Sequence, residues 1–206
     1  MIKTKEDLKY YLEQDRLNLH IKKNKPNKHD IVWIYEIILR KCEYYHNLKK
    51  KNIIQKILYK HYSKRLHKMS YMYTTSIPIN TTGPGLSIAH MGGIYINSKA
   101  RIGKNLRIQT GVVIGGDARY PNKLAKIGDN VYIGVGAKII GPRIIADDVA
   151  IGANAVVTKD ILEAHTTWAG VPAKKISDNS SRLYIDKRLF PDDPIYDTVS
   201  YETWDE

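Results

Sequence analysis

The sequence of 206 residues contains a single cysteine, Cys42. One cysteine cannot form an intrachain disulfide, and a chain without disulfides is typical of a reducing compartment. Long apolar runs are also missing. The longest, Ile31 to Leu39, is interrupted by Glu36 and is far shorter than the ~20 residues that a membrane-spanning helix needs. No apolar signal region follows Met1. These features predict a cytoplasmic protein that is not integral to a membrane.

Histidine is scarce in the second part of the chain. Residues 76–206 contain only His90 and His165. A metal-dependent hydratase of β-helical architecture needs about three histidine ligands. We therefore expect no metal site in this sequence.

Acidic residues are outnumbered over most of the chain, and the formal net charge is +12. Residues 1–75 contain 18 Lys and Arg against 7 Asp and Glu, residues 76–176 contain 12 against 6, and residues 177–206 contain 3 against 8. The basic first segment could attract nucleic acid, anionic lipid or an acidic polysaccharide, or its lysines could be ordinary solvated positions. Because no recognition motif accompanies the charge, we expect no nucleic-acid partner. A weak membrane or acidic-polymer contact stays open.

A six-residue repeat dominates the middle of the sequence. Ten units between Ile96 and Leu162 each open with Ile or Val, and one insertion, Tyr120 to Lys126, breaks their register. The fifth position is mostly Ala, Val or Leu, with Arg143 as the exception. Hexapeptide repeats of this kind predict a parallel β-helix, in which stacked coils bury a continuous apolar column. The leading residues are Ile96, Ile102, Ile108, Ile114, Ile127, Ile133, Ile139, Ile145, Ile151 and Val157.

The sequence before the repeat predicts a helical head. Thr4 can cap a helix that runs to about Gln14, and Asp30 can cap a second helix. Apolar residues at helical spacing then continue past Lys49 to Asn52, as Ile53, Ile57, Tyr62 and Leu66. Pro78, Gly83 and Pro84 cannot continue a helix, so residues 76–85 should be an extended entry into the coils.

The chain therefore divides into three parts. We expect a basic α-helical head at residues 1–75, the β-helix at residues 76–176 and an acidic C-terminal tail at residues 177–206. The fold class is thus all-β with an N-terminal helical head. Open coils leave strand edges and flat faces uncovered, which favours an oligomer.

Several motifs outside the repeat pattern occur together. They are the segment Gly85-Leu-Ser-Ile-Ala-His-Met-Gly-Gly-Ile94, the Gly115-Gly116 pair, the Arg119-Tyr-Pro insertion and the ending Ala169-Gly-Val-Pro-Ala173. Over residues 76–176 these motifs resemble the serine acetyltransferase family. The resemblance is closest to the branch found in bacterial capsule and exopolysaccharide gene clusters, because Leu39 to Tyr45 is similar to a Leu-Arg-Lys-x-Glu-Tyr-Tyr segment of that branch. The family implies a left-handed β-helix, a homotrimer, and acetyl-CoA bound in a cleft between neighbouring coils.

The resemblance also implies the chemistry. His90 matches the general base of the family, a neutral imidazole that takes the proton of an attacking hydroxyl. A backbone N–H of the Gly115-Gly116 stretch, with Gly116 as the candidate, matches the donor that stabilises the tetrahedral oxyanion. No side chain is acylated in this scheme, so transfer is direct.

Two sets of binding residues follow from the same resemblance. The candidates for acetyl-CoA are Val135, Ala153, Thr158, Lys159 and Lys174. The candidates for the acceptor are Arg119 and Tyr120, in an insertion that we expect to project from the coils beside His90.

Two departures from the family bear on the acceptor. Ala89 stands where the family has an Asp before the base, and Tyr120 stands where it has a second His. The first change removes an orienting partner of the His90 ring, and the second removes a group that the family associates with holding the amino acid acceptor, so a changed acceptor explains both. The sequence favours an O-acetyltransferase that acts on a sugar hydroxyl of a surface polysaccharide or its precursor. L-serine as the acceptor, and a non-catalytic β-helical scaffold, stay open as alternatives.

Overall fold

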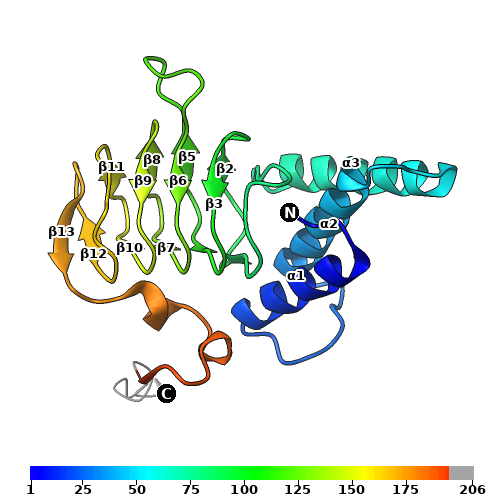
Figure 1. Cartoon of the computed structure of the whole chain (residues 1–206), viewed down its shortest axis with the longest axis horizontal. Helices are drawn as coiled ribbons and strands as arrows, with labels where there is room; N and C mark the ends of the chain where they lie inside the picture. The colour runs from blue at the N-terminus through cyan, green and yellow to red at the C-terminus, as the bar shows by residue number, and fades with distance from the viewer. Residues whose placement is uncertain (195–206) are drawn as a thin grey trace.

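The computed structural model describes residues 1–194. A helical head stands at one end of a stack of β-coils, and the C-terminal segment runs back below the stack towards the head (Figure 1). The helices of the head are α1 (Lys5–Asn18), α2 (Ile31–Asn47) and α3 (Ile53–Met72). No helix within residues 1–194 is long and apolar enough to cross a membrane.

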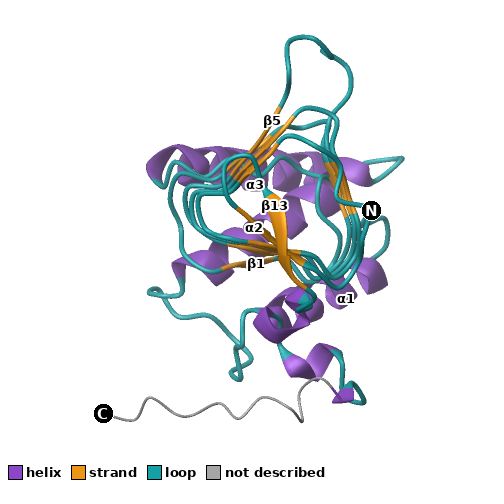
Figure 2. Cartoon of the chain, turned by 90° about the vertical axis from the view of Figure 1, so that its left-hand side faces the viewer, coloured by secondary structure: helices purple, strands orange, loops and turns teal. Residues whose placement is uncertain are grey.

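The strands form three sheets that make the faces of a triangular prism, seen end-on in Figure 2. Sheet 1 contains β1 (Ser87–Ile88), β4 (Arg107–Ile108), β7 (Tyr132–Ile133), β10 (Ala150–Ile151), β12 (Thr167–Ala169) and the antiparallel β13 (Lys174–Ser177). Sheet 2 contains β2 (Tyr95–Ile96), β5 (Val113–Gly115), β8 (Lys138–Ile140) and β11 (Val156–Val157). Sheet 3 contains β3 (Arg101–Ile102), β6 (Lys126–Ile127) and β9 (Ile144–Ile145).

The repeat explains this architecture unit by unit. Each six-residue unit supplies one strand, and the chain visits sheet 1, sheet 2 and sheet 3 in turn, so three units make one coil. Every leading Ile or Val of the repeat is buried inside the prism. In the insertion the register is restored by Ala125, which is buried at the position that a fifth residue would occupy. The predicted parallel β-helix is confirmed.

One coil begins before the repeat. Ser76 pairs with Tyr95 and Thr82 pairs with Ile102 as single bridges, and β1 completes this coil. The prediction of a plain extended entry over residues 76–85 was therefore incomplete. Another coil covers only one side of this first coil, and the helical head covers the other. Because the residues of the first coil pack against the helices on one side, their sequence does not show the six-residue pattern.

Acidic side chains of the head satisfy the open backbone edge of the first coil. Three buried carboxylates accept hydrogen bonds from backbone N–H groups: Asp15 from Leu86 at 2.8 Å, Glu36 from Ile88 at 2.9 Å and Glu43 from Asn80 at 2.7 Å. An unpaired strand edge would leave these N–H groups without partners. The head thus takes the place of a further coil.

A fully buried arginine links the same acids. The guanidinium of Arg40 pairs with Asp15 at 2.7 Å and with Glu43 at 3.1 Å. It also donates to the backbone carbonyl of Thr82 at 3.1 Å and to that of Gly83 at 2.6 Å. Buried charges are tolerated when they are paired and hydrogen-bonded in this way.

The predicted caps of the first two helices had different outcomes. Thr4 caps α1, and with Asp7 it forms a complete capping box, as the sequence indicates, although the helix continues past Gln14. Asp30 occupies the N-cap position of α2, but its side chain makes no capping hydrogen bond. Its carboxylate instead accepts from the backbone N–H of Asn27 and pairs with Lys23 at 2.6 Å. The predicted capping role of Asp30 was wrong.

The apolar stripe predicted along α3 does not act as one face. Tyr62 and Leu66 lie towards α2 and the core, whereas Ile53 and Ile57 are exposed. Ile57 and Tyr62 are five residues apart, so Ile53 and Ile57 lie on the opposite side of the helix from Tyr62 and Leu66.

The first part of the predicted tail packs against the rest of the protein. The 3-10 helices η1 (Ser181–Tyr184) and η2 (Lys187–Leu189) contact β7 and α1, respectively. Arg182 pairs with Asp148 at 2.6 Å, and Arg188 donates to the carbonyl of Leu17 at 3.1 Å. Residues 195–206 of the predicted tail lie outside the described residues.

Candidate active site

His90 lies at the corner where the chain leaves sheet 1 for sheet 2. The corners of successive coils stack through backbone hydrogen bonds, from Gly111 to Gly92 at 3.1 Å, from Gly136 to Thr110 at 2.8 Å and from Asn154 to Val135 at 2.7 Å. Val135 and Ala153 are exposed in this same column. We call this column of corners, with His90 at its start, the first edge.

Glycine makes the first edge possible. Gly111 has a φ of +73°, and a Cβ added to it would lie 3.3 Å from the Cα atom of Gly136 in the next coil. A side chain at this position would be strained in conformation and too close to the neighbouring backbone. The close stacking of the corners places Val135 and Ala153, both exposed, along one line.

The imidazole of His90 is exposed and has no hydrogen-bond partner among residues 1–194. Without the Asp of the family at position 89, a backbone carbonyl is the alternative support that the sequence suggests for the ring, and no such contact forms in the single chain. The backbone is better fixed: Ala89 N–H donates to the carbonyl of Ile108 at 3.0 Å. The position of the residue is therefore set, but the orientation of its ring is not.

Lys174 lies close to the far end of the first edge. The turn between β12 and β13 is bonded to Val156 on both sides, since Val156 N–H donates to the carbonyl of Gly170 at 3.0 Å and Ala173 N–H donates to that of Val156 at 2.9 Å. Lys174 follows directly and is exposed. Its ammonium group is available to an anion that lies along the last coils.

The remaining candidates gather at a different corner, where the chain leaves sheet 2 for sheet 3. Gly116 follows β5 there, and Thr158 and Lys159 follow β11. The stacking of this corner is shown by the hydrogen bond from Gly141 N–H to the carbonyl of Gly115 at 3.0 Å. We call this column the second edge. The backbone N–H of Gly116 is exposed and has no acceptor within the described chain.

The insertion projects from the second edge, away from the prism (Figures 1 and 2). Asp117 at its base accepts from the backbone N–H of Arg119 at 2.9 Å and from its guanidinium at 2.7 Å. These hydrogen bonds lower the pKa of Asp117 to about 2. The guanidinium of Arg119 lies 5.9 Å from the centre of the Tyr120 ring. Asp117 thus holds Arg119 and Tyr120 together on an exposed loop.

This geometry corrects one expectation. Parallel strands all start at one edge of a sheet and end at the other, and His90 precedes the strands of sheet 2 whereas Gly116 follows them. The insertion therefore does not lie beside His90 in a single chain. The sequence positions alone could not show this, because the repeat does not state which corner each unit occupies.

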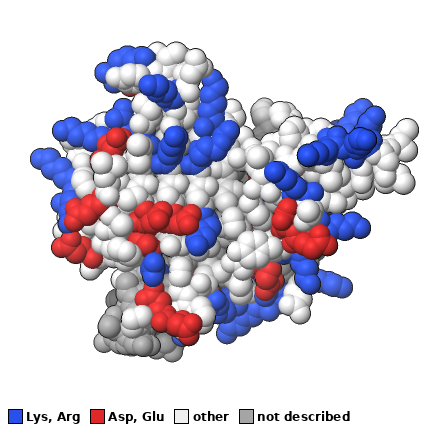
Figure 3. Space-filling model, in the orientation of Figure 1, with Lys and Arg blue, Asp and Glu red and all other residues white. Residues whose placement is uncertain are grey.

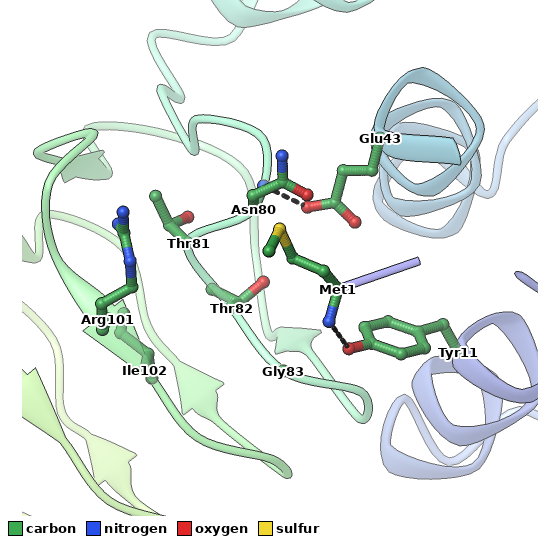
Figure 4. A pocket seen from close by; sticks show the side chains of 9 residues that line it. All are labelled: Met1, Tyr11, Glu43, Asn80, Thr81, Thr82, Gly83, Arg101 and Ile102. Atoms are coloured by element: carbon green, nitrogen blue, oxygen red, sulfur yellow. Dashed lines mark hydrogen bonds between the residues drawn. The ribbon is translucent and has the colours of Figure 1, made fainter. Parts of the chain in front are cut away.

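Two other features of the described chain add no candidate. Among residues 1–194, no three His, Cys, Asp or Glu side chains form a group that could hold a metal ion. A cavity of about 380 Å³ lies between the head and the first coil, beside Tyr11 and Arg101 (Figure 4). The carboxylate of Glu43 in its wall already bonds Asn80 and Arg40. This cavity belongs to the contact between the head and the coil and lies apart from both edges.

The fold and the repeat define a class of protein. Residues 125–159 match the family described as bacterial transferase hexapeptide (six repeats). The solved structure of serine acetyltransferase from Brucella abortus has a TM-score of 0.68 with 22% identity, and covers 86% of this chain and 72% of that one. A serine acetyltransferase in complex with CoA has a TM-score of 0.63 with 22% identity, over 83% and 68% of the two chains. The fold is a left-handed parallel β-helix with an N-terminal helical region.

Among curated proteins the similarity is to serine acetyltransferases. That of Staphylococcus epidermidis is 36% identical over 122 residues, which is 58% of this chain and 56% of the relative. That of Helicobacter pylori is 41% identical over 96 residues, which is 46% of this chain and 56% of the relative. The chain therefore spans a little over half the length of these curated relatives.

Proposed function

We propose that the protein is an acetyl-CoA-dependent O-acetyltransferase. The observation that carries this proposal is an exposed His90 at the start of a column in which Val135 and Ala153 are also exposed. Such a column offers a base at one end of a line of exposed residues along which a long thioester could lie. The similarity to serine acetyltransferases, one of them solved with CoA, supports the same activity.

In the proposed reaction, His90 Nε2 or Nδ1 takes the proton of the acceptor hydroxyl while the hydroxyl oxygen attacks the thioester carbonyl. The new C–O bond gives a tetrahedral oxyanion, which accepts a hydrogen bond from the backbone N–H of Gly116. When the C–S bond breaks, the thiolate of CoA leaves and takes the proton from the imidazolium. His90 is neutral again after each turnover.

A covalent route through cysteine does not fit the chain. Cys42 is buried in α2, away from both edges, and burial raises the pKa of its thiol to about 11. A thiol in this state is neither accessible nor ionised at neutral pH. Direct transfer needs only His90 and the backbone donor.

The proposed site needs two chains, because His90 and Gly116 lie on opposite edges of sheet 2. In a homotrimer with cyclic symmetry, the second edge of one subunit meets the first edge of the next. That contact would bring Gly116, Arg119 and Lys159 of one chain towards His90 and Ala153 of its neighbour. We propose this trimer as the active form.

L-serine is the first acceptor that we propose, since the similar proteins from Staphylococcus epidermidis and Helicobacter pylori are serine acetyltransferases. A sugar hydroxyl, in a surface polysaccharide or its precursor, is the second. It is favoured by Ala89 and by the Tyr120 ring, which is exposed on the insertion and could stack on the face of a sugar. This second acceptor would place the chain in the capsule and exopolysaccharide branch.

The test measures thiol release from acetyl-CoA by the purified protein, first with L-serine and then with mono- and oligosaccharides. His90→Ala is the matched control, since His90 is exposed and its loss should not unfold the protein. Saturable release with serine, reduced about 10²–10⁴-fold in the variant, supports a serine acetyltransferase. Release with sugars alone supports the second acceptor. No release with either, while the protein remains folded, supports the non-catalytic scaffold.

A further inference from the structure

The first two turns of α3 present isoleucine to solvent. Ile53 is 76% exposed, Ile54 is 63% exposed and Ile57 is 62% exposed. These three residues lie at the end of the helix that is farthest from the β-helix (Figure 1). Exposed apolar side chains are normal when scattered, but three within two turns form a patch that needs an explanation.

The packing of α3 shows that this patch faces outward. Tyr62 stacks on Tyr45 of α2 with ring centres 5.7 Å apart, and the ring centres of Tyr59 and His46 are 5.5 Å apart. Further along, Leu66 and Met69 pack against the core. At 100° per residue these four positions share one side of the helix, and the three isoleucines lie on the other side. No residue of α3 is fully buried.

The same surface is strongly basic. No Asp or Glu occurs between Glu43 and Asp117. Three lysines, Lys49 to Lys51, directly precede the helix, and α3 itself contributes Lys56, Lys60, Lys64, Arg65 and Lys68. None of these cations forms an ion pair with a residue of the described chain. In the space-filling view, Lys and Arg side chains gather over the outer end of α3 (Figure 3).

The combination of positive charge and exposed apolar side chains favours one class of binding partner over two others. A second copy of this chain would bring two acid-free basic faces together, which like-charge repulsion disfavours. An acidic polymer would neutralise the lysines but would leave the isoleucines in water. An anionic bilayer accommodates both, because its negative surface attracts nearby lysines and apolar side chains insert at the acyl boundary.

We propose that α3 is a docking surface for an anionic lipid bilayer. Ile53, Ile54 and Ile57 insert among the lipid headgroups, and Lys49 to Lys51 lie against the lipid phosphates. The surface is independent of the proposed acetyl transfer, since α3 contributes no residue to either edge. It holds the protein peripherally, with the lysines and the isoleucines both required.

The experiment is cosedimentation of the full chain with vesicles of phosphatidylcholine containing about 30% phosphatidylglycerol, and with vesicles of phosphatidylcholine alone. Two triple variants test the surface: Ile53, Ile54 and Ile57 to Ser, and Lys49, Lys50 and Lys51 to Gln. Two matched controls make the same changes elsewhere: exposed Ile144, Leu162 and Ile176 to Ser, and exposed Lys22, Lys25 and Lys28 to Gln. A melting curve for each variant shows that it is folded.

We expect binding to the anionic vesicles only, weakened at least about tenfold by each test variant, changed less than about twofold by each control, and lost in 0.5 M salt. The proposal is overturned by absent binding to the anionic vesicles or by equal losses in test and control variants. It is also overturned if light scattering shows self-association that the isoleucine variant abolishes, since α3 would then be an interface between copies. Cosedimentation does not measure thiol release, so the proposed acetyl transfer can fail without affecting the result for membrane binding.

Discussion

The carboxylate of Glu36 on α2 accepts a hydrogen bond of 2.9 Å from the backbone N–H of Ile88, two residues before His90. Its other oxygen, Oε2, is buried and has no hydrogen-bond partner in the described chain. Burial raises the pKa of Glu36 well above the usual range of a glutamate, and the nearby charge of Asp15 raises it further. The strand that carries the proposed base is therefore held by a carboxyl group whose pKa lies above that of an ordinary glutamate.

The raised pKa of Glu36 predicts a pH-dependent stability. In the unfolded chain the group titrates near 4.5, and in the folded chain it titrates higher, despite the opposing influence of Arg40 and Arg107. Its contribution is thus fully present below about pH 4.5 and declines as the pH rises towards the folded value. Glu36→Gln keeps the acceptor for Ile88 and removes the titration.

Urea unfolding of both proteins at pH 5 and pH 8 checks this prediction. The free energy of unfolding of Glu36→Gln should rise relative to that of the wild type as the pH increases. Contributions from other titrating groups are common to the two proteins and cancel in this difference. A difference between them that does not change with pH would show that folding does not raise the pKa of Glu36.

Replacing Arg40 should strongly lower the free energy of unfolding. Arg40→Met leaves Asp15 and Glu43 buried without their cation, and breaking a buried pair in this way costs about 3–5 kcal/mol. Arg119→Met breaks an ion pair whose arginine side chain is 78% exposed, and such surface pairs contribute little to stability. Chemical denaturation of the two variants measures the contrast. Similar small losses would mean that the head does not depend on the buried cluster.

The core of the β-helix should respond to cavities as a close-packed interior does. Ile133 is fully buried, so Ile133→Ala should lower the free energy of unfolding by about 2–5 kcal/mol. Ile57→Ala removes the same atoms from an exposed position on α3 and should change it by less than about 0.5 kcal/mol. Equal effects in thermal or urea unfolding would contradict the placement of either residue.

The β-helix could be predicted because every six-residue unit carries the same local pattern of apolar residues. Each leading residue, such as Ile114 or Ile133, marks the same place in a coil, and only the register had to be recognised. The first coil was missed since helices cover it, and packing against helices imposes no period of six. The exposure of Ile53 was missed because the predicted stripe joined two opposite faces of α3 across the five-residue step from Ile57 to Tyr62.

The contact between the head and the coils could not be read from the sequence. Asp15, Glu36 and Glu43 stand among many lysines, and nothing in their spacing distinguishes buried acceptors from solvated charges. They become recognisable only when the unpaired N–H groups of the first coil are placed beside them. The candidate site was limited in the same way: its residue types could be named, but their division between two edges depends on topology.

That division leads to a prediction about mixed assemblies. His90→Ala removes the proposed base from the first edge, and Arg119→Ala removes a proposed acceptor contact from the second edge. Each variant alone should be nearly inactive at low acceptor concentration. If the two chains are coexpressed with different tags and the mixed trimers are isolated, neighbouring subunits should complement one another.

The expected yield follows from cyclic symmetry. In a trimer that contains both variants, only one contact joins an intact first edge to an intact second edge, so about one third of the wild-type thiol release should return. A site built within one chain would give no recovery, because every chain carries a defect. Mixed assemblies of His90→Ala with itself under both tags provide the background. Recovery near one third would establish that base and acceptor loop come from different subunits, and its absence would place His90 and Arg119 in the same chain's site or remove one of them from the reaction.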